Sequence, residues 1–416
     1  MRPVYIIGIG MTPFGRHLDK SIKVLTKAAL DSALADADIK LNKIEAAWFA
    51  NSGWGNSSGQ HCIRGQVALR PAGIQGIPIT NVENACAGGA TALHLAWLGV
   101  ASGLYDCALA IGVEKTYLDD KEKMFQAFWS GFDVENAVEH LKTLQAVSDS
   151  IKPYIYEIET DGAGKKRSAF MDVYSAFCRW HMARYHTTQK QLAVIAAKNH
   201  FHSTMNPYAQ YQKEMGVEEI LSARLVSWPL TVPMCAPLGD GAAAAILCSK
   251  EFMDRLSYAR PVKVRASILG SGTDRPLEDE VSDIAVRLSR KAYEVAGVGP
   301  EDIDVAEVHD ATAFGELHQT ESLGFCQFGE GGLFAESGAT RLGGKLPINT
   351  SGGLVSRGHP IAATGIAQIH ELVTQLRHEA GARQVEKCRL ALAENGGGNL
   401  GFEDAAMAIH ILERIS

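Results

Sequence analysis

The chain contains one order of predicted elements twice, and this repetition limits its possible folds more than any other feature. Residues 31–49 predict a helix, a turn and a strand, and residues 291–308 predict the same unit again. A glycine- and alanine-rich helix follows in each copy, at 86–95 and at 359–369, and an apolar strand comes after it. Helices and strands that alternate in this way favour an α/β fold over separate all-α and all-β domains.

The length of the chain supports two fused halves. With 416 residues and 46% hydrophobic content, it can bury a large core. We expect a first half at 1–250 and a second half at 251–416, with the two small-residue helices buried between sheets. A polar excursion at about 115–235 carries amphipathic helices near 169–186 and 188–201. We interpret it as an inserted loop lobe that covers the mouth of an active site.

Charge and cysteine content exclude several classes of function. The formal net charge of −7 gives no reason to expect nucleic acid or an anionic membrane as a partner. No stretch approaches the roughly 18 apolar residues of a spanning helix. The first residues resemble a strand more than a signal peptide, so we expect a cytoplasmic protein. The eight cysteines show no Cys-x-x-Cys spacing, and we expect no metal site.

Cys86 and His359 occupy similar places in the two copies, each beside glycines at the start of a helix. The free N–H groups and the dipole of a helix N-terminus favour negative charge, which suits a thiolate. We therefore predict that Cys86 is a nucleophile and that His359 is its base. The alternatives are a small buried thiol, which is the common state of a free cysteine, and a hydrogen-bonded structural histidine.

Several motifs together resemble the thiolase superfamily. Asn84-Ala-Cys86-Ala-Gly-Gly and Gly358-His359-Pro are similar to its active-site segments. Three further segments resemble the sterol-carrier-protein-type and archaeal branch: Glu307-Val-His309-Asp310-Ala-Thr, Lys198-Asn-His200-Phe-His-Ser-Thr-Met-Asn206-Pro and Pro347-Ile-Asn349-Thr-Ser-Gly-Gly. The resemblance covers essentially the whole chain. It implies a duplicated, five-layered α-β-α-β-α fold, a homodimer, and acyl-CoA substrates.

The chain departs from the thiolase pattern at its second cysteine. Thiolases carry that cysteine either before a C-terminal glycine cluster or directly after the His-Asp pair. Here the first place reads Ala393-Glu394-Asn395-Gly396-Gly397-Gly398, and the second reads His309-Asp310-Ala311. We hypothesise that Glu394, or a water that it holds, replaces the missing thiol as acid and base. The alternative is a buried carboxylate that is satisfied by the backbone.

The resemblance also suggests roles for the neighbouring residues. His309 is expected to donate to an oxyanion, and the backbone N–H groups of Cys86 and Gly396 are expected to form a second oxyanion hole. Asn395 and Gly397 are assigned to substrate binding, because glycines let the backbone approach a thioester.

The predicted activity is that of an acyl-CoA C-acyltransferase. It would cleave a β-keto acyl-CoA with CoA through an acyl-Cys86 intermediate, and an aromatic substrate such as benzoylsuccinyl-CoA fits the branch. Coenzyme A is then a substrate, and no bound cofactor is expected. The branch also implies a small partner subunit with an OB fold and a zinc ribbon. Two alternatives remain: a thiolase-like retro-aldolase that acts on acyl-CoA side chains, and an inactive scaffold subunit of an acyltransferase complex.

Overall fold

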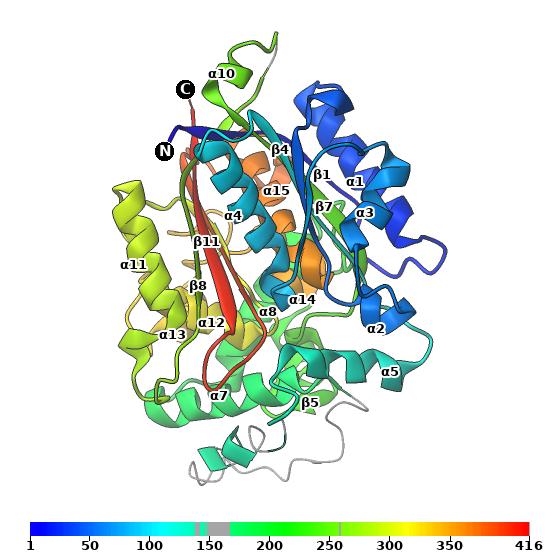
Figure 1. Cartoon of the computed structure of the whole chain (residues 1–416). Coiled ribbons are helices and arrows are strands. Elements are labelled where there is room, and N and C mark those ends of the chain that lie inside the picture. Colours follow the sequence, from blue (N-terminus) through cyan, green and yellow to red (C-terminus); the bar gives the residue numbers. More distant parts are fainter. Residues whose placement is uncertain (137, 139–141, 145, 148–166, 258, 416) are drawn as a thin grey trace.

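The computed structural model describes residues 1–136, 138, 142–144, 146–147, 167–257 and 259–415 (Figure 1). Part of the lobe predicted at 115–235 therefore lies outside the described residues. The strands are β1 (Val4–Met11), β2 (Ala46–Ala50), β3 (Ile79–Val82), β4 (Cys107–Lys115), β5 (Leu225–Ser227), β6 (Leu230–Thr231), β7 (Asp240–Ser249), β8 (Val262–Ser271), β9 (Val305–Glu307), β10 (Leu390–Gly397) and β11 (Ala406–Arg414).

The described chain also contains α-helices. They are α1 (Ile22–Ala37), α2 (Trp54–Ser58), α3 (Arg64–Leu69), α4 (Gly88–Ala101), α5 (Lys121–Gln126), α7 (Phe170–Tyr185), α8 (Gln189–Ser203), α9 (Val217–Leu221), α10 (Lys250–Met253), α11 (Ile284–Ala296), α12 (Ala313–Ser322), α13 (Gly331–Glu336), α14 (Gly353–Arg357) and α15 (Thr364–Leu376). The two amphipathic helices predicted in the lobe correspond to α7 and α8. Within the described residues, none of the helices has the length and apolar character needed to cross a membrane.

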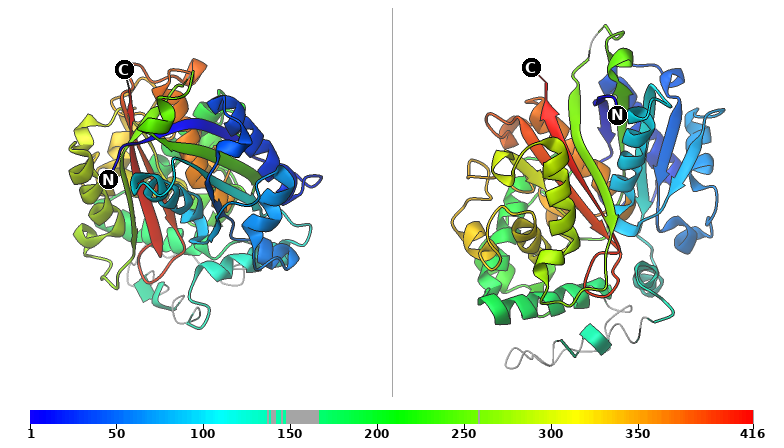
Figure 2. Two further views of the ribbon diagram at one scale, coloured as in Figure 1. Left: turned by 45° about the horizontal axis from the view of Figure 1, so that its top comes forward. Right: turned by 60° about the vertical axis from the view of Figure 1, so that its left-hand side comes forward.

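The strands form one folded sheet with the order β3-β2-β4-β7-β1-β8-β11-β10-β9. The five strands up to β1 come from residues before 250, and the four from β8 onward come from residues after 261. Among the described strands, the two groups join where β1 meets β8, through the pairs Tyr5 with Lys263 and Ile6 with Val262. Figure 2 shows the two groups of strands facing each other across the molecule. We propose a division of the halves near residue 250.

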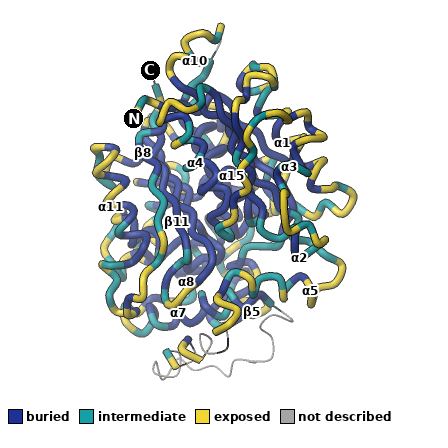
Figure 3. Tube along the Cα trace, in the orientation of Figure 1, coloured by how far each residue is buried: buried dark blue, intermediate teal, exposed yellow. Residues whose placement is uncertain are grey.

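Helices α4 and α15 fill the space between the two groups of strands (Figure 1). Their small residues allow close approach, because a Cβ on Gly365 would lie 2.5 Å from Ala90 N, and one on Gly89 would lie 2.5 Å from Ala362 O. Helices α1 and α3 cover the outer face of the first group, and α11 covers that of the second. Figure 3 shows the inner layers as buried. The predicted order of five layers, α-β-α-β-α, is thus the observed one.

Candidate active site

Cys86 lies on a tight turn between strand β3 and helix α4. Ala85, directly before it, has a φ of 47°, a left-handed conformation that is unfavourable for alanine. The Asn84 side chain donates to Thr91 Oγ1 at 3.1 Å and ties the turn to the first part of α4. Gly397 of strand β10 packs against this turn, since a Cβ there would lie 2.7 Å from Cys86 N. The turn is therefore held between its own helix and the second half of the chain.

His359 faces Cys86 from the second half of the chain. The distance from its Nε2 to Cys86 Sγ is 3.3 Å, and the distance from its Nδ1 to Thr364 Oγ1 is 2.7 Å. The Thr364 hydroxyl donates its own proton to Pro360 O, so its oxygen accepts from His359 Nδ1–H. The lone pair of Nε2 then points at the thiol, as a general base requires.

His309 approaches the same site with the opposite tautomer. Its ring lies 5.2 Å from the His359 ring, centre to centre, and is nearly perpendicular to it. The Asn395 side-chain amide lies 2.8 Å from His309 Nδ1 and donates to it. Nδ1 is then an acceptor, and the proton is carried by Nε2. A neutral histidine with Nε2–H is suited to donate a hydrogen bond to a developing oxyanion.

Electrostatics keep the thiol and both imidazoles neutral in the substrate-free protein. Burial raises the pKa of Cys86 to about 12, and the nearby carboxyl of Asp404 adds to this effect. Burial lowers the pKa of His309 to about 3, and burial, together with His309 and then Arg357, lowers the pKa of His359 well below its usual value. The sequence favoured a resting thiolate at the helix start, but burial outweighs that effect here. The thiol proton must therefore move to His359 during attack.

Glu394 and Gly396 lie on the opposite face of strand β10 from Asn395. Side chains alternate along a strand, and Asn395 points to α15, beside Gly365. The Glu394 carboxylate is fully buried and accepts from the backbone N–H of His309 at 2.8 Å. The structure thus does not bring this carboxyl to Cys86: its Oε2 is bound by the backbone, and its Oε1 is buried with no hydrogen-bond partner among the described residues.

The glycines that line the cavity with Cys86, His309 and His359 are Gly397 and Gly398, whereas the prediction placed Gly396 beside the thiol. Gly396 lies opposite Met407 in the sheet, and its α-carbon faces the carboxylate of Asp404. Asn395, predicted to bind substrate, lies behind His309 and fixes its ring.

The cavity lined by Cys86, His309 and His359 has about 1070 Å³ of empty space, part of it open to solvent. A second cavity of about 820 Å³ shares Phe170, Tyr174, His309, Gly398 and Asp404 with it. The wall of the second cavity includes six aromatic side chains, Phe170, Tyr174, Phe177, Trp180, Phe314 and Phe402, together with five charged ones, Arg275, Glu280, Asp283, Glu403 and Asp404. Apolar walls with a few converging polar groups are typical of sites for small organic ligands.

Comparison with known proteins identifies the family. Residues 4–220 match the family model described as Thiolase, N-terminal domain, and residues 276–414 match the one described as Thiolase C-terminal domain-like. The chain belongs to the thiolase family. An acetyl-CoA acetyltransferase of Methanothermobacter thermautotrophicus is 37% identical to this thiolase over 419 residues, which cover 100% of both chains.

This thiolase is also similar to two further proteins. Benzoylsuccinyl-CoA thiolase subunit BbsB of Thauera aromatica is 34% identical, with 95% of each chain covered. The solved structure of the Ltp2-ChsH2(DUF35) aldolase has a TM-score of 0.76 at 22% identity, covers 99% and 98% of the two chains, and shows a shared fold. The predicted family, fold class and enzyme class are confirmed: this is a thiolase-type acyltransferase.

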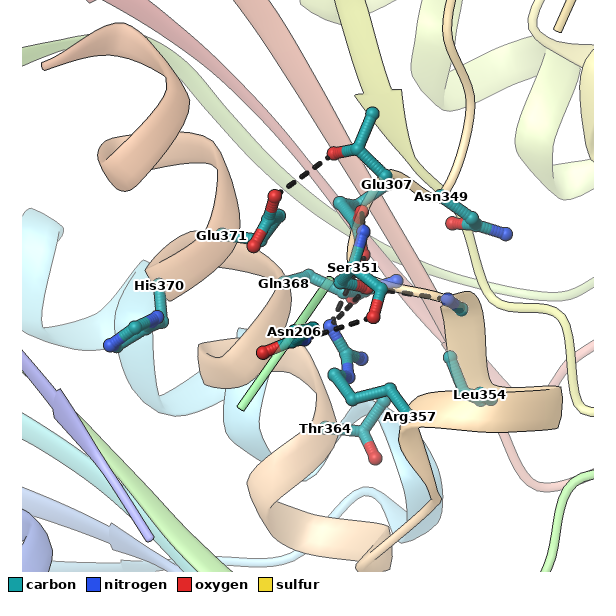
Figure 4. Close-up of polar contacts among 12 residues, drawn as sticks. Asn206, Glu307, Asn349, Ser351, Leu354, Arg357, Thr364, Gln368, His370 and Glu371 are labelled. Carbon is teal, nitrogen blue, oxygen red and sulfur yellow. Dashed lines mark hydrogen bonds and ion pairs between the residues drawn. The ribbon is translucent and has the colours of Figure 1, made fainter. Parts of the chain in front are cut away.

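A buried frame of charged and polar groups supports the thiolase site from behind (Figure 4). Arg357, two residues before His359, bonds through Nη1 to Glu307 Oε2 at 3.1 Å and to Ser351 Oγ at 3.0 Å. Asp310 accepts from Leu354 N at 2.6 Å and so caps helix α14, which leads to His359. Asp310 therefore orients the segment that leads to His359.

Cys86, His309 and His359 also meet a geometric condition for binding a metal ion. Their ligand atoms all lie within 4.8 Å of one another, and within the described part of the chain they form the one such group of three. One thiol and two imidazoles form a donor set that zinc accepts.

Sequence reasoning missed two residues of this site. Thr364 fixes the tautomer of His359, and its position five residues after His359, at the start of helix α15, was the available signal. Asp404 lines both cavities and lies on the hairpin between β10 and β11. The repeat offered a hint, since Gly239-Asp240 stands before the last strand of the first half as Asp404 stands before that of the second.

Proposed function

We propose that this thiolase cleaves a β-keto acyl-CoA with CoA through an acyl-Cys86 intermediate. The observation that carries the proposal is the chain of contacts from Cys86 Sγ through His359 to Thr364, which directs a basic lone pair at a thiol. The position of His309 supports it, because its Nε2–H is available to a ketone oxygen in the same cavity.

The reaction begins when His359 Nε2 takes the proton of Cys86. The sulfur attacks the ketone carbon, and negative charge develops on the ketone oxygen, where His309 donates a hydrogen bond. The carbon–carbon bond then breaks, which leaves an acyl group on Cys86 and an enolate of the shorter acyl-CoA. Attack of a second CoA on the acyl group releases the product, and His359 returns its proton to Cys86.

An aromatic acyl group suits the second cavity, next to His309. Six aromatic side chains surround it, and edge or stacking contacts with a phenyl ring contribute about 0.5–1.5 kcal/mol for each pair beyond area burial. The relative from Thauera aromatica is named for benzoylsuccinyl-CoA, which contains such a ring. We therefore propose benzoylsuccinyl-CoA, or a related aryl keto acyl-CoA, as substrate. The benzoyl group would pass to Cys86, and succinyl-CoA would leave.

The remaining residues act through these groups in the proposed mechanism. Asn395 and Glu394 position the ring and backbone of His309, and Gly397 lets strand β10 approach the Cys86 turn. The Cys86 N–H serves a second oxyanion hole; the glycine that faces it is Gly397 rather than Gly396.

The assembly of the protein is also part of the proposal. We propose a homodimer that works with a small OB-fold, zinc-ribbon subunit in the cytoplasm. The aldolase complex with the same fold carries a DUF35 component in its name, which supports a second chain. Size-exclusion chromatography with light scattering, with and without a co-expressed neighbouring subunit, tests this arrangement.

The direct test is intact-mass spectrometry after incubation with benzoylsuccinyl-CoA, with and without the partner subunit. We expect an adduct of one benzoyl group on Cys86 that free CoA removes as benzoyl-CoA. Cys86→Ala should form none. Cys107→Ala is a matched control, since Cys107 is a buried thiol inside strand β4 and lines none of these cavities. An adduct that persists in Cys86→Ala would contradict the proposal.

The position of Tyr174 favours a retro-aldolase as the second candidate function. Its half-buried ring lines both cavities, so its phenol is available to exchange protons with a substrate that bears a hydroxyl group. A retro-aldolase would release an aldehyde or ketone from a β-hydroxyacyl-CoA and would need no acyl-enzyme. An inactive scaffold subunit would give neither an adduct nor a carbonyl product, so the same assay separates all three functions.

A further inference from the structure

The proposed reaction needs a group that handles two protons which His359 does not carry. One proton must reach the enolate when the carbon–carbon bond breaks, and one must leave CoA before its sulfur attacks the acyl group. Thiolases use a second cysteine for this work, and neither of its usual places holds one here. The following inference rests on the thiolytic function proposed above.

Asp404 is the one carboxylic acid among the described residues that line the cavity with Cys86, His309 and His359. Glu83 lies on another side of Cys86, where Ala85 N and Ser52 Oγ already bond to its Oε1. Glu114 is fully buried and accepts from Ser52 N and Gly53 N, each at 3.0 Å. Glu394 is deeper and fully buried behind His309. Of the acids near the thiol, Asp404 is thus the one in a position to meet a substrate that His309 also contacts.

The hairpin that carries Asp404 is anchored by its neighbour and leaves Asp404 available. Glu403 bonds to Arg275 Nε at 2.7 Å and to the backbone N–H of Ile284 at 2.8 Å. The Asp404 carboxylate has no hydrogen bond or ion pair with any described residue. Gly396 makes room for it, since a Cβ on Gly396 would collide with Asp404 Oδ2. The site thus holds an unpartnered carboxyl group, packed against strand β10 where Gly396 has no side chain.

We propose that Asp404 is the catalytic acid and base that replaces the second cysteine of thiolases. Protonated Asp404 gives its proton to the α-carbon of the enolate as the carbon–carbon bond breaks, and the shorter acyl-CoA leaves. The resulting carboxylate accepts the proton of the incoming CoA thiol. The CoA sulfur attacks the acyl carbon, the bond to Cys86 breaks, and Cys86 recovers its proton from His359. Each group ends in its starting state.

The surroundings of Asp404 suit a group that must both give and take a proton. Burial and the charges of Asp283 and Glu403 raise the pKa of Asp404 to about 7, while His318 acts in the other direction. Glu394, Tyr174 and Cys86 are the further titratable groups that sense its charge. An acid with a pKa near the working pH is efficient in both directions.

Cys235 is the competing candidate for this role. It lines the same cavity, and the next residue, Ala236, donates from its N–H to Ala311 O at 2.9 Å, beside the place where the branch carries its second cysteine. Burial raises the pKa of Cys235 to about 12, so its thiol is a far weaker acid at neutral pH than Asp404. If Asp404 has this role, its replacement should abolish proton exchange and replacement of Cys235 should not; if Cys235 has it, the reverse should hold.

The test measures exchange of α-protons for deuterium in acetyl-CoA and succinyl-CoA, incubated in D₂O with the full protein and any partner subunit it requires. We expect Asp404→Asn to lower the exchange rate at least about 100-fold, the lower range for loss of a general acid or base. Asp404→Glu should retain part of the rate, and Cys235→Ala should keep it. Alkylation of Cys86 by iodoacetamide and the melting temperature verify that each variant is folded.

Exchange at the wild-type rate in Asp404→Asn would overturn the inference, as would loss of exchange in Cys235→Ala alone. Absence of exchange by the wild type would also overturn it; the benzoyl adduct on Cys86 would then show whether thiolysis itself survives. If Asp404→Asn does not fold, the pH profile decides. We expect an inflection near pH 7 in the wild type that moves in Asp404→Glu, and an unmoved inflection counts against Asp404.

Discussion

Replacing Thr364 with valine should slow acylation of Cys86 without unfolding the protein. Valine has nearly the same shape, but it lacks the oxygen that accepts from His359 Nδ1–H at 2.7 Å. The neutral imidazole is then free to adopt the other tautomer, in which Nε2 carries the proton and no longer accepts one from the thiol. The lost hydroxyl donation to Pro360 O leaves one carbonyl without that partner.

The magnitude follows from the charge that develops on His359. When its ring takes the Cys86 proton it becomes an imidazolium, and its bond to Thr364 becomes a charge-assisted hydrogen bond worth about 1.5–3 kcal/mol. Loss of that stabilisation in the transition state corresponds to an acylation rate about 10–150-fold lower, at about 1.4 kcal/mol for each factor of ten. Thr364→Ser keeps the oxygen and should restore most of the rate.

Rapid-quench mass spectrometry of the benzoyl adduct on Cys86 measures this rate. Thr374→Val is the matched control, because Thr374 lies in the same helix, is also buried, and makes the same kind of bond, to His370 O at 2.7 Å, away from the thiol. If both valine variants acylate at equal rates, or if Thr364→Val acylates as fast as the wild type, Thr364 has no part in orienting the base.

Three further predictions concern the thiol and its neighbours. Gly397→Ala should destabilise the fold by about 1–3 kcal/mol, the usual cost of overpacking, and suppress the adduct, whereas Gly216→Ala, in open space, should change neither; thermal melts and the mass assay check this. Since the raised pKa of about 12 keeps Cys86 protonated, alkylation by iodoacetamide should keep rising from pH 7 to pH 10, and a plateau near pH 7 would contradict a neutral resting pair. Micromolar Zn²⁺ should inhibit adduct formation by binding to Cys86, His309 and His359, and EDTA should reverse this inhibition. His309→Ala should weaken the inhibition; equal inhibition of the wild type and this variant would place the metal elsewhere.

The sequence was most informative where a repeat and a motif agreed. Cys86 and His359 occupy equivalent places in two copies of one unit, so their meeting in the middle of a layered fold followed from the duplication. The small residues of the two central helices likewise predicted close packing, because only such residues let two backbones approach.

The register of strand β10 could not be predicted from the sequence. Glu394 and Asn395 are adjacent and both polar, and the choice of which one faces Cys86 depends on how β10 pairs with β9 and β11. A shift of one residue would exchange their faces. Asp404 escaped notice for a related reason: it reaches the site only because a hairpin returns the chain to Gly396.

The division of the site between the two halves has a consequence for the newly made chain. Cys86 precedes His359 by 273 residues. At translation rates of about 5–20 residues per second, roughly 14–55 s pass between synthesis of the two. During that interval the thiol has no base beside it. Reactivity towards acyl thioesters therefore arises only when the segment that carries His359 has left the ribosome and docked, which protects the nascent chain from premature acylation.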